Sequence, residues 1–354
     1  MRGLRLYLAP FAPDTSGAAA VFFPLDCLLV ILDAGGCAGN ICAFDEPRWE
    51  EKGAARRRSK VFSAALRDMD AILGRDEKFL AKLRAATEEI SAEFIAIVGT
   101  PVPSVIGTDL ASLKRMAAKQ TGLATITAEA DGTKFYDVGI HKALTALVDK
   151  FAPGGNERQT VKGTVALWGG TPLDLSPDDM QRIKDGLRRD GWQKIVYCGA
   201  TAANLRDVFG AERNLALSAA GIDTVRRLSE RYGTPYGIYA PPRLDNILTV
   251  NRTQLSDAWT KILIMHEEVT MNGLRRELKA RLPQAEIICG GWFMRHKEYT
   301  EPQDVSFTEE DEWQDYVRRG NFDCIFADKT FQKAVSFYDG VWIDLPHYAV
   351  SGSR

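Results

Sequence analysis

Two cysteines that follow a pair of glycines near the start of the chain are the residues best suited to chemistry. An apolar run over residues 27–32 is followed by Gly35, Gly36 and Cys37, and Cys42 comes five residues later. Because glycine has no Cβ, such a corner at the end of a strand lets a thiolate lie against a bulky inorganic group. We therefore take Gly35, Gly36, Cys37 and Cys42 as candidate binding residues, with Cys37 and Cys42 as metal ligands. A tight turn that carries two inert cysteines is the alternative.

Other common catalytic patterns are absent from the sequence. The four histidines, His141, His266, His296 and His347, show no metal or triad spacing, and His266 has no second histidine four residues on. The sequence also lacks a G-x-S-x-G elbow and a G-x-x-x-x-G-K-[ST] phosphate loop, which excludes the hydrolases and ATPases that carry them. A dinucleotide fingerprint is missing too. The catalytic residues of any reaction stay unknown at this point.

Composition limits the class of protein. The 354 residues are 45% apolar and 26% charged with a formal net charge of -2, which is typical of a globular protein and argues against a nucleic-acid partner. Apolar stretches are too short for a membrane span, and prolines and acids interrupt the one at the N-terminus. Six cysteines without regular spacing do not form a disulfide framework. These features predict a protein of the reducing cytoplasm.

The remaining four cysteines are expected to pack in the core. Cys27 lies in the apolar run, and Cys198, Cys289 and Cys324 lie in or at the ends of predicted strands, where small buried residues are common. Cys198 and Cys289 each precede a glycine at the carboxyl end of a strand, which is a place where function concentrates. Their roles stay open.

Strands alternate with helices along the chain. We expect strands at residues 93–98, 123–127, 164–168, 194–198, 214–218, 285–289, 324–327 and 341–345. Helices are expected at residues 59–73, 76–90, 138–151, 202–209 and 223–232, with one beginning at Asp109, one capped by Ser176 and a long helical stretch at 254–282. A stiff extended loop is expected at residues 99–103. This alternation predicts an α/β fold of two to three Rossmann-like doubly wound parallel-sheet domains.

The Pro-Gly-Gly-Asn stretch after Ala152 is the best linker by composition. It divides the chain into an N-terminal α/β domain with the glycine-cysteine corner, residues 1–155, and a second Rossmann-like domain, residues 156–248. Residues 249–354 would form a shortened third α/β domain with a long leading helix.

Three stretches together resemble nitrogenase component 1 and its relatives, which include the dark-operative protochlorophyllide reductase subunits and the nickel-sirohydrochlorin reductive cyclase. Residues 34–39 (AGGCAG) are similar to the family's Gly-Pro-x-Gly-Cys cluster corner. Residues 100–109 (TPVPSVIGTD) resemble its loop into an Ile-Gly-Asp-Asp helix start. Residues 214–236, from Asn-Leu to Tyr-Gly-Thr-Pro-Tyr, resemble a third hallmark. Order and spacing agree over roughly residues 15–245.

The resemblance implies three Rossmann-like domains, an iron-sulfur cluster at a subunit interface, and electrons from a separate ATP-dependent iron protein. Only Cys37 carries over as a cluster ligand. No cysteine stands at residues 11–14 or at Pro101, where the family has further ligands, and Val225 stands where nitrogenase anchors its iron-molybdenum cofactor. A divergent short member is therefore implied, which does not reduce N2 and holds no cofactor of the iron-molybdenum type.

A [4Fe-4S]-type cluster needs four thiolates or substitutes for them. If Cys37 and Cys42 both bind, the other ligands must come from a second subunit, so we expect a homodimer or a heterodimer with a related component 1-like chain. Asp14, Asp33 or Asp45 would be oxygen ligands, or else ordinary turn and cap residues.

The first functional hypothesis is an iron-sulfur oxidoreductase subunit that reduces a small unsaturated or tetrapyrrole-like substrate. A metallocofactor-assembly scaffold would use the same residues. The alternative from another class is a cluster-free α/β binding or regulatory subunit, which the missing cysteines favour and whose inter-domain cleft would hold a small ligand.

Overall fold

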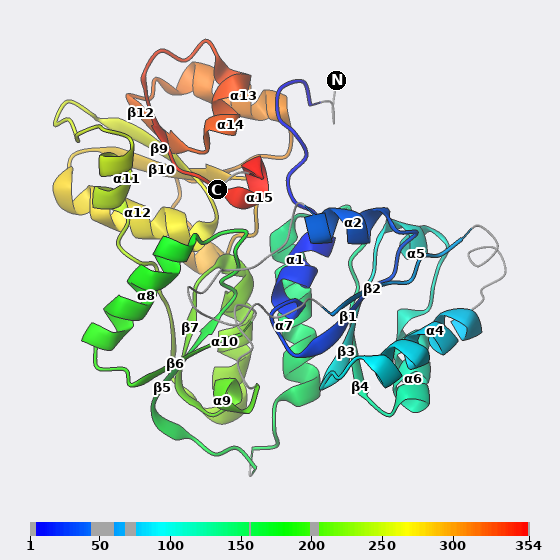
Figure 1. The fold of residues 1–354 in the computed structure, drawn as a ribbon. Helices are drawn as coiled ribbons and strands as arrows, with labels where there is room; N and C mark the ends of the chain where they lie inside the picture. The colour runs from blue at the N-terminus through cyan, green and yellow to red at the C-terminus, as the bar shows by residue number, and fades with distance from the viewer. Residues whose placement is uncertain (1–4, 44–59, 68–75, 156, 199–204, 353–354) are drawn as a thin grey trace.

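The computed structural model describes residues 5–43, 60–67, 76–155, 157–198 and 205–352. Its strands form three separate sheets, and every paired strand within them runs parallel to its neighbour. Helices cover the sheets, as Figure 1 shows. The expected α/β fold of Rossmann-like domains is confirmed.

The first sheet has the order β2-β1-β3-β4. Its strands are β1 (Cys27–Ile31), β2 (Val61–Ser63), β3 (Phe94–Val98) and β4 (Ala124–Ala128). Every residue of β1 and β3 is buried, because helices pack on both faces of this sheet. The helices here are α1 (Asp14–Phe22), α2 (Gly36–Ala43), α4 (Asp76–Glu89), α5 (Pro101–Val105), α6 (Leu110–Thr121) and α7 (Tyr136–Phe151).

The second sheet has the order β6-β5-β7-β8. Its strands are β5 (Val161–Trp168), β6 (Lys194–Tyr197), β7 (Ala211–Ala216) and β8 (Tyr236–Ile238), and its helices are α8 (Pro177–Arg189), α9 (Leu205–Phe209) and α10 (Ala219–Tyr232). The next helix, α11 (Leu244–Val250), packs in the apolar core of the third sheet. Ser176 begins α8 through a capping box with Asp179, which confirms the predicted cap.

The third sheet has the order β11-β10-β9-β12-β13. Its strands are β9 (Lys261–Met265), β10 (Glu286–Gly291), β11 (Val305–Ser306), β12 (Cys324–Ala327) and β13 (Val341–Asp344). The helical segments are α12 (Glu268–Arg281), η1 (Lys297–Tyr299), α13 (Glu310–Gly320), α14 (Lys329–Gln332), η2 (Lys333–Val335) and α15 (Tyr348–Ser351).

Three predicted elements are wrong. The long helical stretch at 254–282, expected to lead the third domain, contains the buried strand β9 and only then α12. Residues 61–63 of the helix predicted at 59–73 instead form β2, which pairs with β1; residues 59 and 68–73 lie outside the described parts of the chain. The loop at 99–103 becomes helical from Pro101, because proline is tolerated where a helix begins.

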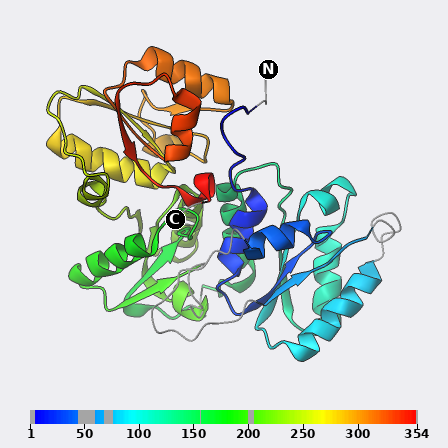
Figure 2. The ribbon, with the colours of Figure 1, turned by 45° about the horizontal axis from the view of Figure 1, so that its top comes forward.

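One continuous apolar core includes side chains from all three sheets. Close packing of α1 on α7 joins the N-terminal helix to the first sheet: a Cβ on Gly17 would lie 1.7 Å from the carbonyl oxygen of Tyr136, and one on Gly139 would lie 1.8 Å from that of Asp14. The segment before α1 runs from the first sheet toward the third, as Figures 1 and 2 show. The domain boundaries after residues 155 and 248 stay predictions.

No helix in the described ranges is both long and apolar enough to cross a bilayer.

Candidate functional site

The glycine-cysteine corner lies where β1 ends and α2 begins, at the carboxyl edge of the first sheet. Ligands of open α/β sheets bind at this edge. Gly35 has a φ of 112°, a conformation that residues with a Cβ rarely adopt. The chain can therefore turn sharply from β1 into α2, which places Cys37 in the first turn of that helix.

Asp33 fixes the geometry of this corner. Its carboxylate accepts hydrogen bonds from the Ala38 amide (2.8 Å) and from the Ser63 hydroxyl (2.7 Å), so it ties α2 to β2. The side chain is only 1% exposed. Because both oxygens already have partners inside the chain, the structure favours the cap residue over the oxygen ligand that the sequence left open.

The Cys37 side chain is half-buried and lies beside Thr100, which follows β3. Thr100 also donates a hydrogen bond to the Leu32 carbonyl (2.7 Å), so it links the carboxyl ends of β1 and β3. Burial, reinforced by the charge of Asp33, raises the pKa of the Cys37 thiol, although Thr100 opposes the shift. The free thiol is thus protonated at neutral pH, and a metal ion would bind it with release of that proton.

Within the described parts of the chain, no atom lies close to the glycines around Cys37. A Cβ built on Gly35, Gly36 or Gly39 would meet none of the described atoms within 4 Å. Gly35 is explained by its φ, but no contact in the described residues explains glycine at 36 and 39. Glycine is also used where another molecule approaches the backbone closely. The two positions are therefore consistent with a group or a protein surface outside this chain.

The loop that resembles the family's second motif lies at the same sheet edge. It forms α5, whose Val105 is 87% exposed, and Ile106 directly after it is 42% exposed. Large apolar side chains gathered at one exposed site are typical of contact surfaces. Pro101 is exposed as well, and its ring offers no metal ligand.

The second predicted ligand cannot be placed in the same way. Cys42 falls within α2, but its side chain is not among those that the structure describes. Positions five apart on an α-helix are about 140° apart around its axis, so the C-x4-C spacing alone does not bring Cys37 and Cys42 to one face. Cys42 as a ligand stays a prediction, and Asp45 lies outside the described residues.

Residues 11–14, where the family has its earlier cysteine, are used for packing. Phe11 lies among Phe135, Trp292, Phe293 and Phe331, with ring centroids 5.5–5.7 Å apart. Asp14 is fully buried and accepts hydrogen bonds from the amides of Gly132 (2.8 Å) and Asp131 (3.2 Å). Here too the carboxylate acts as a turn residue.

Four other cysteines are in the core, as expected. Cys27, Cys198, Cys289 and Cys324 are all buried. Burial raises the pKa of each thiol, to about 12 for Cys198 and Cys289. Such thiols are inert at neutral pH. Among the described residues no group of three or more histidine, cysteine or acidic side chains is arranged to hold a metal ion.

A buried polar cluster that sequence reasoning missed lies where the three sheets meet. Tyr136, at the start of α7, donates a hydrogen bond to Asp174, and its hydroxyl lies 3.0 Å from Nε2 of His347. The same Nε2 lies 3.2 Å from Asp174, and the His347 ring stacks on His266 with centroids 3.9 Å apart. We call Tyr136, Asp174, His266 and His347 the junction cluster. Their separation along the chain left no sequence signal for it.

Burial shifts the pKa values of several side chains at this junction. Burial, together with His347, holds the pKa of His266 well below its usual range, and burial raises the pKa of Tyr136. Glu267, which follows β9, accepts hydrogen bonds from Ala219 at the start of α10 and from Val269 in α12. Burial and then Asp174 raise the pKa of Glu267 to about 7. The neutral forms of His266, Tyr136 and Glu267 are thus favoured.

Val225, the position compared with the iron-molybdenum anchor, lies on α10 and is fully buried in the apolar core. Its alkyl side chain offers no metal ligand.

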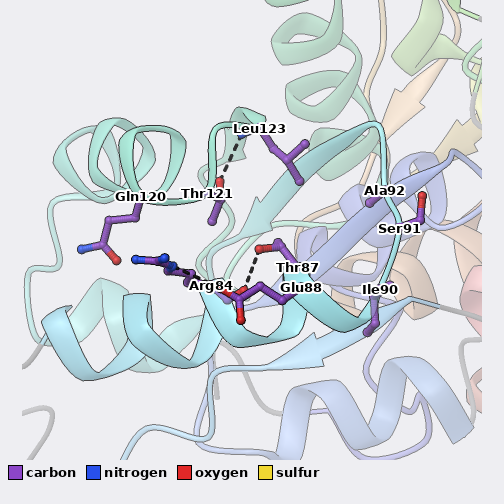
Figure 3. A pocket seen from close by; sticks show the side chains of 9 residues that line it. All are labelled: Arg84, Thr87, Glu88, Ile90, Ser91, Ala92, Gln120, Thr121 and Leu123. Carbon is purple, nitrogen blue, oxygen red and sulfur yellow. Dashed lines mark hydrogen bonds and ion pairs between the residues drawn. The ribbon is translucent and has the colours of Figure 1, made fainter.

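The groove drawn in Figure 3 is unrelated to the cysteine corner. It has a volume of about 440 Å³ and lies between α4 and α6, next to the amino ends of β3 and β4. The exposed ion pair Arg84–Glu88 lines it, with Nε to Oε1 at 3.3 Å. Cys37 lies at the carboxyl ends of the same sheet, so the groove contributes nothing to the candidate site.

Comparison with known protein families identifies the class. The model of the nitrogenase component 1 type oxidoreductases matches residues 15–251. The matched region includes all three motifs and more than half of the chain. This protein therefore belongs to the nitrogenase component 1 type oxidoreductase family, whose members bind iron-sulfur clusters and form oligomers with related subunits.

Among characterised proteins, the chain is similar to the nitrogenase iron-molybdenum cofactor biosynthesis protein NifE. The Mesorhizobium japonicum protein is 26% identical over 245 residues, which are 64% of this chain and 47% of that protein. The Rhodobacter capsulatus protein is 26% identical over 256 residues, 66% of this chain and 50% of that protein. The chain thus spans about half the length of these relatives.

Solved structures of nitrogenase Cp1 share the fold. The structure at pH 5 superposes with a TM-score of 0.70 at 13% identity, covering 98% of this chain and 85% of the other. The structure at pH 6.5 gives a TM-score of 0.69 at the same identity, covering 98% and 86%. At this identity the likeness supports the fold alone.

Proposed function

We propose that this chain is an iron-sulfur oxidoreductase subunit in which Cys37 supplies a thiolate to a cluster held between two chains. The observation that carries the proposal is the position of Cys37. Of the five cysteines whose side chains are described, it alone reaches the surface, and it does so at the carboxyl edge of a parallel sheet. Open glycine positions flank it, as a bulky inorganic group requires.

The number of cluster ligands in this chain is too small, so a second chain is needed. The described part of this corner offers one thiol, and Cys42 would make two, whereas a [4Fe-4S]-type cluster needs four thiolates or substitutes. We therefore propose a homodimer, or a heterodimer with a related component 1-like subunit, that brings further ligands to the cluster. The exposed Val105 and Ile106 at the same sheet edge support a protein contact there.

Residues of this chain would hold the cluster as follows. Asp33 anchors α2 so that Cys37 keeps its position, and Thr100 lies beside the sulfur. When Cys37 binds iron, its proton leaves, because only the thiolate is a ligand. The bound cluster would supply transfer of single electrons. We propose that they come from an ATP-dependent iron protein in the cytoplasm and reduce a small unsaturated or tetrapyrrole-like substrate other than N2.

A metallocofactor-assembly scaffold is the second candidate. The similarity to proteins named for iron-molybdenum cofactor biosynthesis favours it. The same corner would then hold a cluster that is passed on. A scaffold would transfer its iron to an acceptor protein, whereas an oxidoreductase subunit would keep its iron through repeated reduction and oxidation.

A cluster-free binding or regulatory subunit is the third candidate. It is favoured by the aromatic packing of Phe11 and by Pro101, because neither position can bind iron as a family member's cysteine would. Such a chain would keep the fold and the partner surface, and would bind neither iron nor sulfide.

Anaerobic purification separates the two cluster-binding candidates from the cluster-free subunit. The chain is produced alone and together with any related subunit encoded beside it, and iron, sulfide and visible absorbance are measured. We expect a coloured protein whose colour is lost in Cys37→Ser and kept in the matched control Cys198→Ala, because Cys198 is buried in the core. Loss in Cys42→Ser as well would support two ligands per chain. A colourless wild type in every combination would favour the cluster-free subunit.

We also propose that residues 1–155, 156–248 and 249–354 are the three domains. Each range contains one complete sheet. Limited proteolysis near residues 155 and 248 that releases stable fragments would support these boundaries, and cutting mainly inside the sheets would contradict them.

A further inference from the structure

The segment before α1 crosses from the first sheet to the third and is fastened there by one carboxylate. Glu310, the first residue of α13, accepts hydrogen bonds from the amides of Leu6 (3.1 Å), Tyr7 (3.2 Å) and Leu8 (2.9 Å). Acidic side chains are mostly exposed in folded proteins, but Glu310 is only 4% exposed. Figures 1 and 2 both show this segment beside the C-terminal domain.

Below this attachment the segment inserts Phe11 into the aromatic group. The Phe11 ring lies 5.7 Å from that of Phe293, which in turn lies 5.0 Å from His347 and 5.2 Å from Tyr136. The ring of Phe293 therefore lies between Phe11 and the junction cluster. The guanidinium of Arg5 lies 4.3 Å from the centre of the Phe11 ring.

Backbone hydrogen bonds continue the connection through all three domains. The Ala12 amide donates to the Ala349 carbonyl (2.7 Å), and the Ala349 amide donates to the Leu173 carbonyl (3.0 Å). Ala349 lies in α15 two residues after His347, and Leu173 directly precedes Asp174. Two successive backbone hydrogen bonds therefore connect Ala12 of the first domain to Ala349 of the third and Leu173 of the second, next to the junction cluster.

The junction cluster has unused hydrogen-bonding capacity. Oδ2 of Asp174, Nδ1 of His266 and Nδ1 of His347 are buried and make no hydrogen bond to another described residue. These atoms are therefore able to pair with water or another polar molecule that reaches the junction.

We propose that residues 5–12, which we call the clasp, are a releasable fastening that keeps the junction between the three domains closed. While Glu310 binds the clasp, Phe11 seals the aromatic group and Ala12 holds α15 in place. When Glu310 releases it, Phe11 leaves, α15 loses a hydrogen bond, and the junction cluster becomes accessible from solvent. This device is independent of whether the chain binds a cluster at Cys37.

The test removes the acceptor and measures two sites. In Glu310→Ala the three amides lose hydrogen bonds to a charged group, so their hydrogen exchange should rise roughly 10- to 100-fold. Diethyl pyrocarbonate should then modify His347, which is 1% exposed in the closed chain. His141, whose side chain is 31% exposed, serves as the internal positive control for labelling. Both readouts come from mass spectrometry of the full chain.

The matched control is Asp311→Ala, which removes a charge from the same helix start but no bond to the clasp. It should leave exchange at residues 6–8 and labelling of His347 unchanged. Faster exchange in Glu310→Ala with His347 still protected would overturn the proposal, as would no change at either site. If Glu310→Ala loses protection in β9 as well, it has unfolded, and Glu310→Gln, which keeps one acceptor oxygen, is judged by the same two readouts.

Discussion

Replacing Gly39 by alanine separates the requirements of this chain's own fold from those of a molecule that binds it. Gly39 lies inside α2, is exposed, and has no neighbour among the described atoms within 4 Å of an added Cβ. Alanine is favoured over glycine in a helix interior by roughly 0.5–1 kcal/mol. The chain by itself should therefore gain stability from Gly39→Ala.

The proposed partner surface predicts the opposite effect on assembly. If a cluster or a second chain lies against α2, the extra methyl group overpacks that contact and costs about 1–3 kcal/mol, which corresponds to roughly tenfold weaker association or more. Helix stability is measured by hydrogen exchange of the α2 amides in the isolated, metal-free chain. Association and cluster content are measured by native mass spectrometry without oxygen.

Gly35→Ala is the matched comparison. Its φ of 112° makes any residue with a Cβ strained, at a cost of about 1–3 kcal/mol, so this variant should destabilise the isolated chain. A Gly39→Ala chain that is more stable and also assembles and binds iron normally would refute the argument that glycine at this position serves an external contact.

Three further predictions concern single side chains. Asp33→Ala should free the Ala38 amide and the Ser63 hydroxyl, which lowers the stability of the corner by about 2–4 kcal/mol, and unchanged exchange at Ala38 would contradict the role of Asp33. The folded-state pKa of Glu267 is raised to about 7 from an ordinary 4.5, so its contribution to stability is lost as pH rises through that range. The free energy of unfolding of Glu267→Gln, relative to that of the wild type, should therefore increase by at most about 3 kcal/mol between pH 5 and pH 8. Denaturant titrations measure this difference, and parallel pH profiles of the two proteins would contradict it. Val105→Ser should change the stability of the isolated chain by less than about 0.5 kcal/mol but weaken the oligomer seen by sedimentation, and an unaltered oligomer would exclude this contact.

Much of the fold could be predicted from local patterns. Buried parallel strands such as β3 and β12 are short apolar runs between turn signals, and α8 begins at a serine with an acid three residues on. The error at residues 254–282 has the same origin. Residues 261–265 (KILIM) are apolar enough for a buried strand or a helix, and only the sheet neighbours β10 and β12 decide between them.

The candidate site was accessible to sequence reasoning only in part. Gly35, Gly36 and Cys37 are consecutive in the chain, so their position at a strand end could be predicted from residue type alone. The role of Asp33 as an anchor depends on Ser63, thirty residues away, and on a strand that had been predicted as a helix. Local pattern carries no information about such a pairing.

The junction cluster could not be predicted at all. His347 lies 211 residues from Tyr136 along the chain, and the two meet only because three sheets converge. Each histidine therefore seemed isolated in the sequence. Contacts of this length follow from the packing of whole domains rather than from spacing.

Native mass spectrometry of the anaerobically purified protein, with and without Cys37→Ser, tests the central claim most directly. We predict a species of two chains that carries the mass of an iron-sulfur cluster, and its loss when the sulfur of residue 37 is replaced. A wild-type chain that is monomeric and free of iron, alone and with every related subunit supplied, would contradict the proposal that Cys37 binds a cluster between two chains.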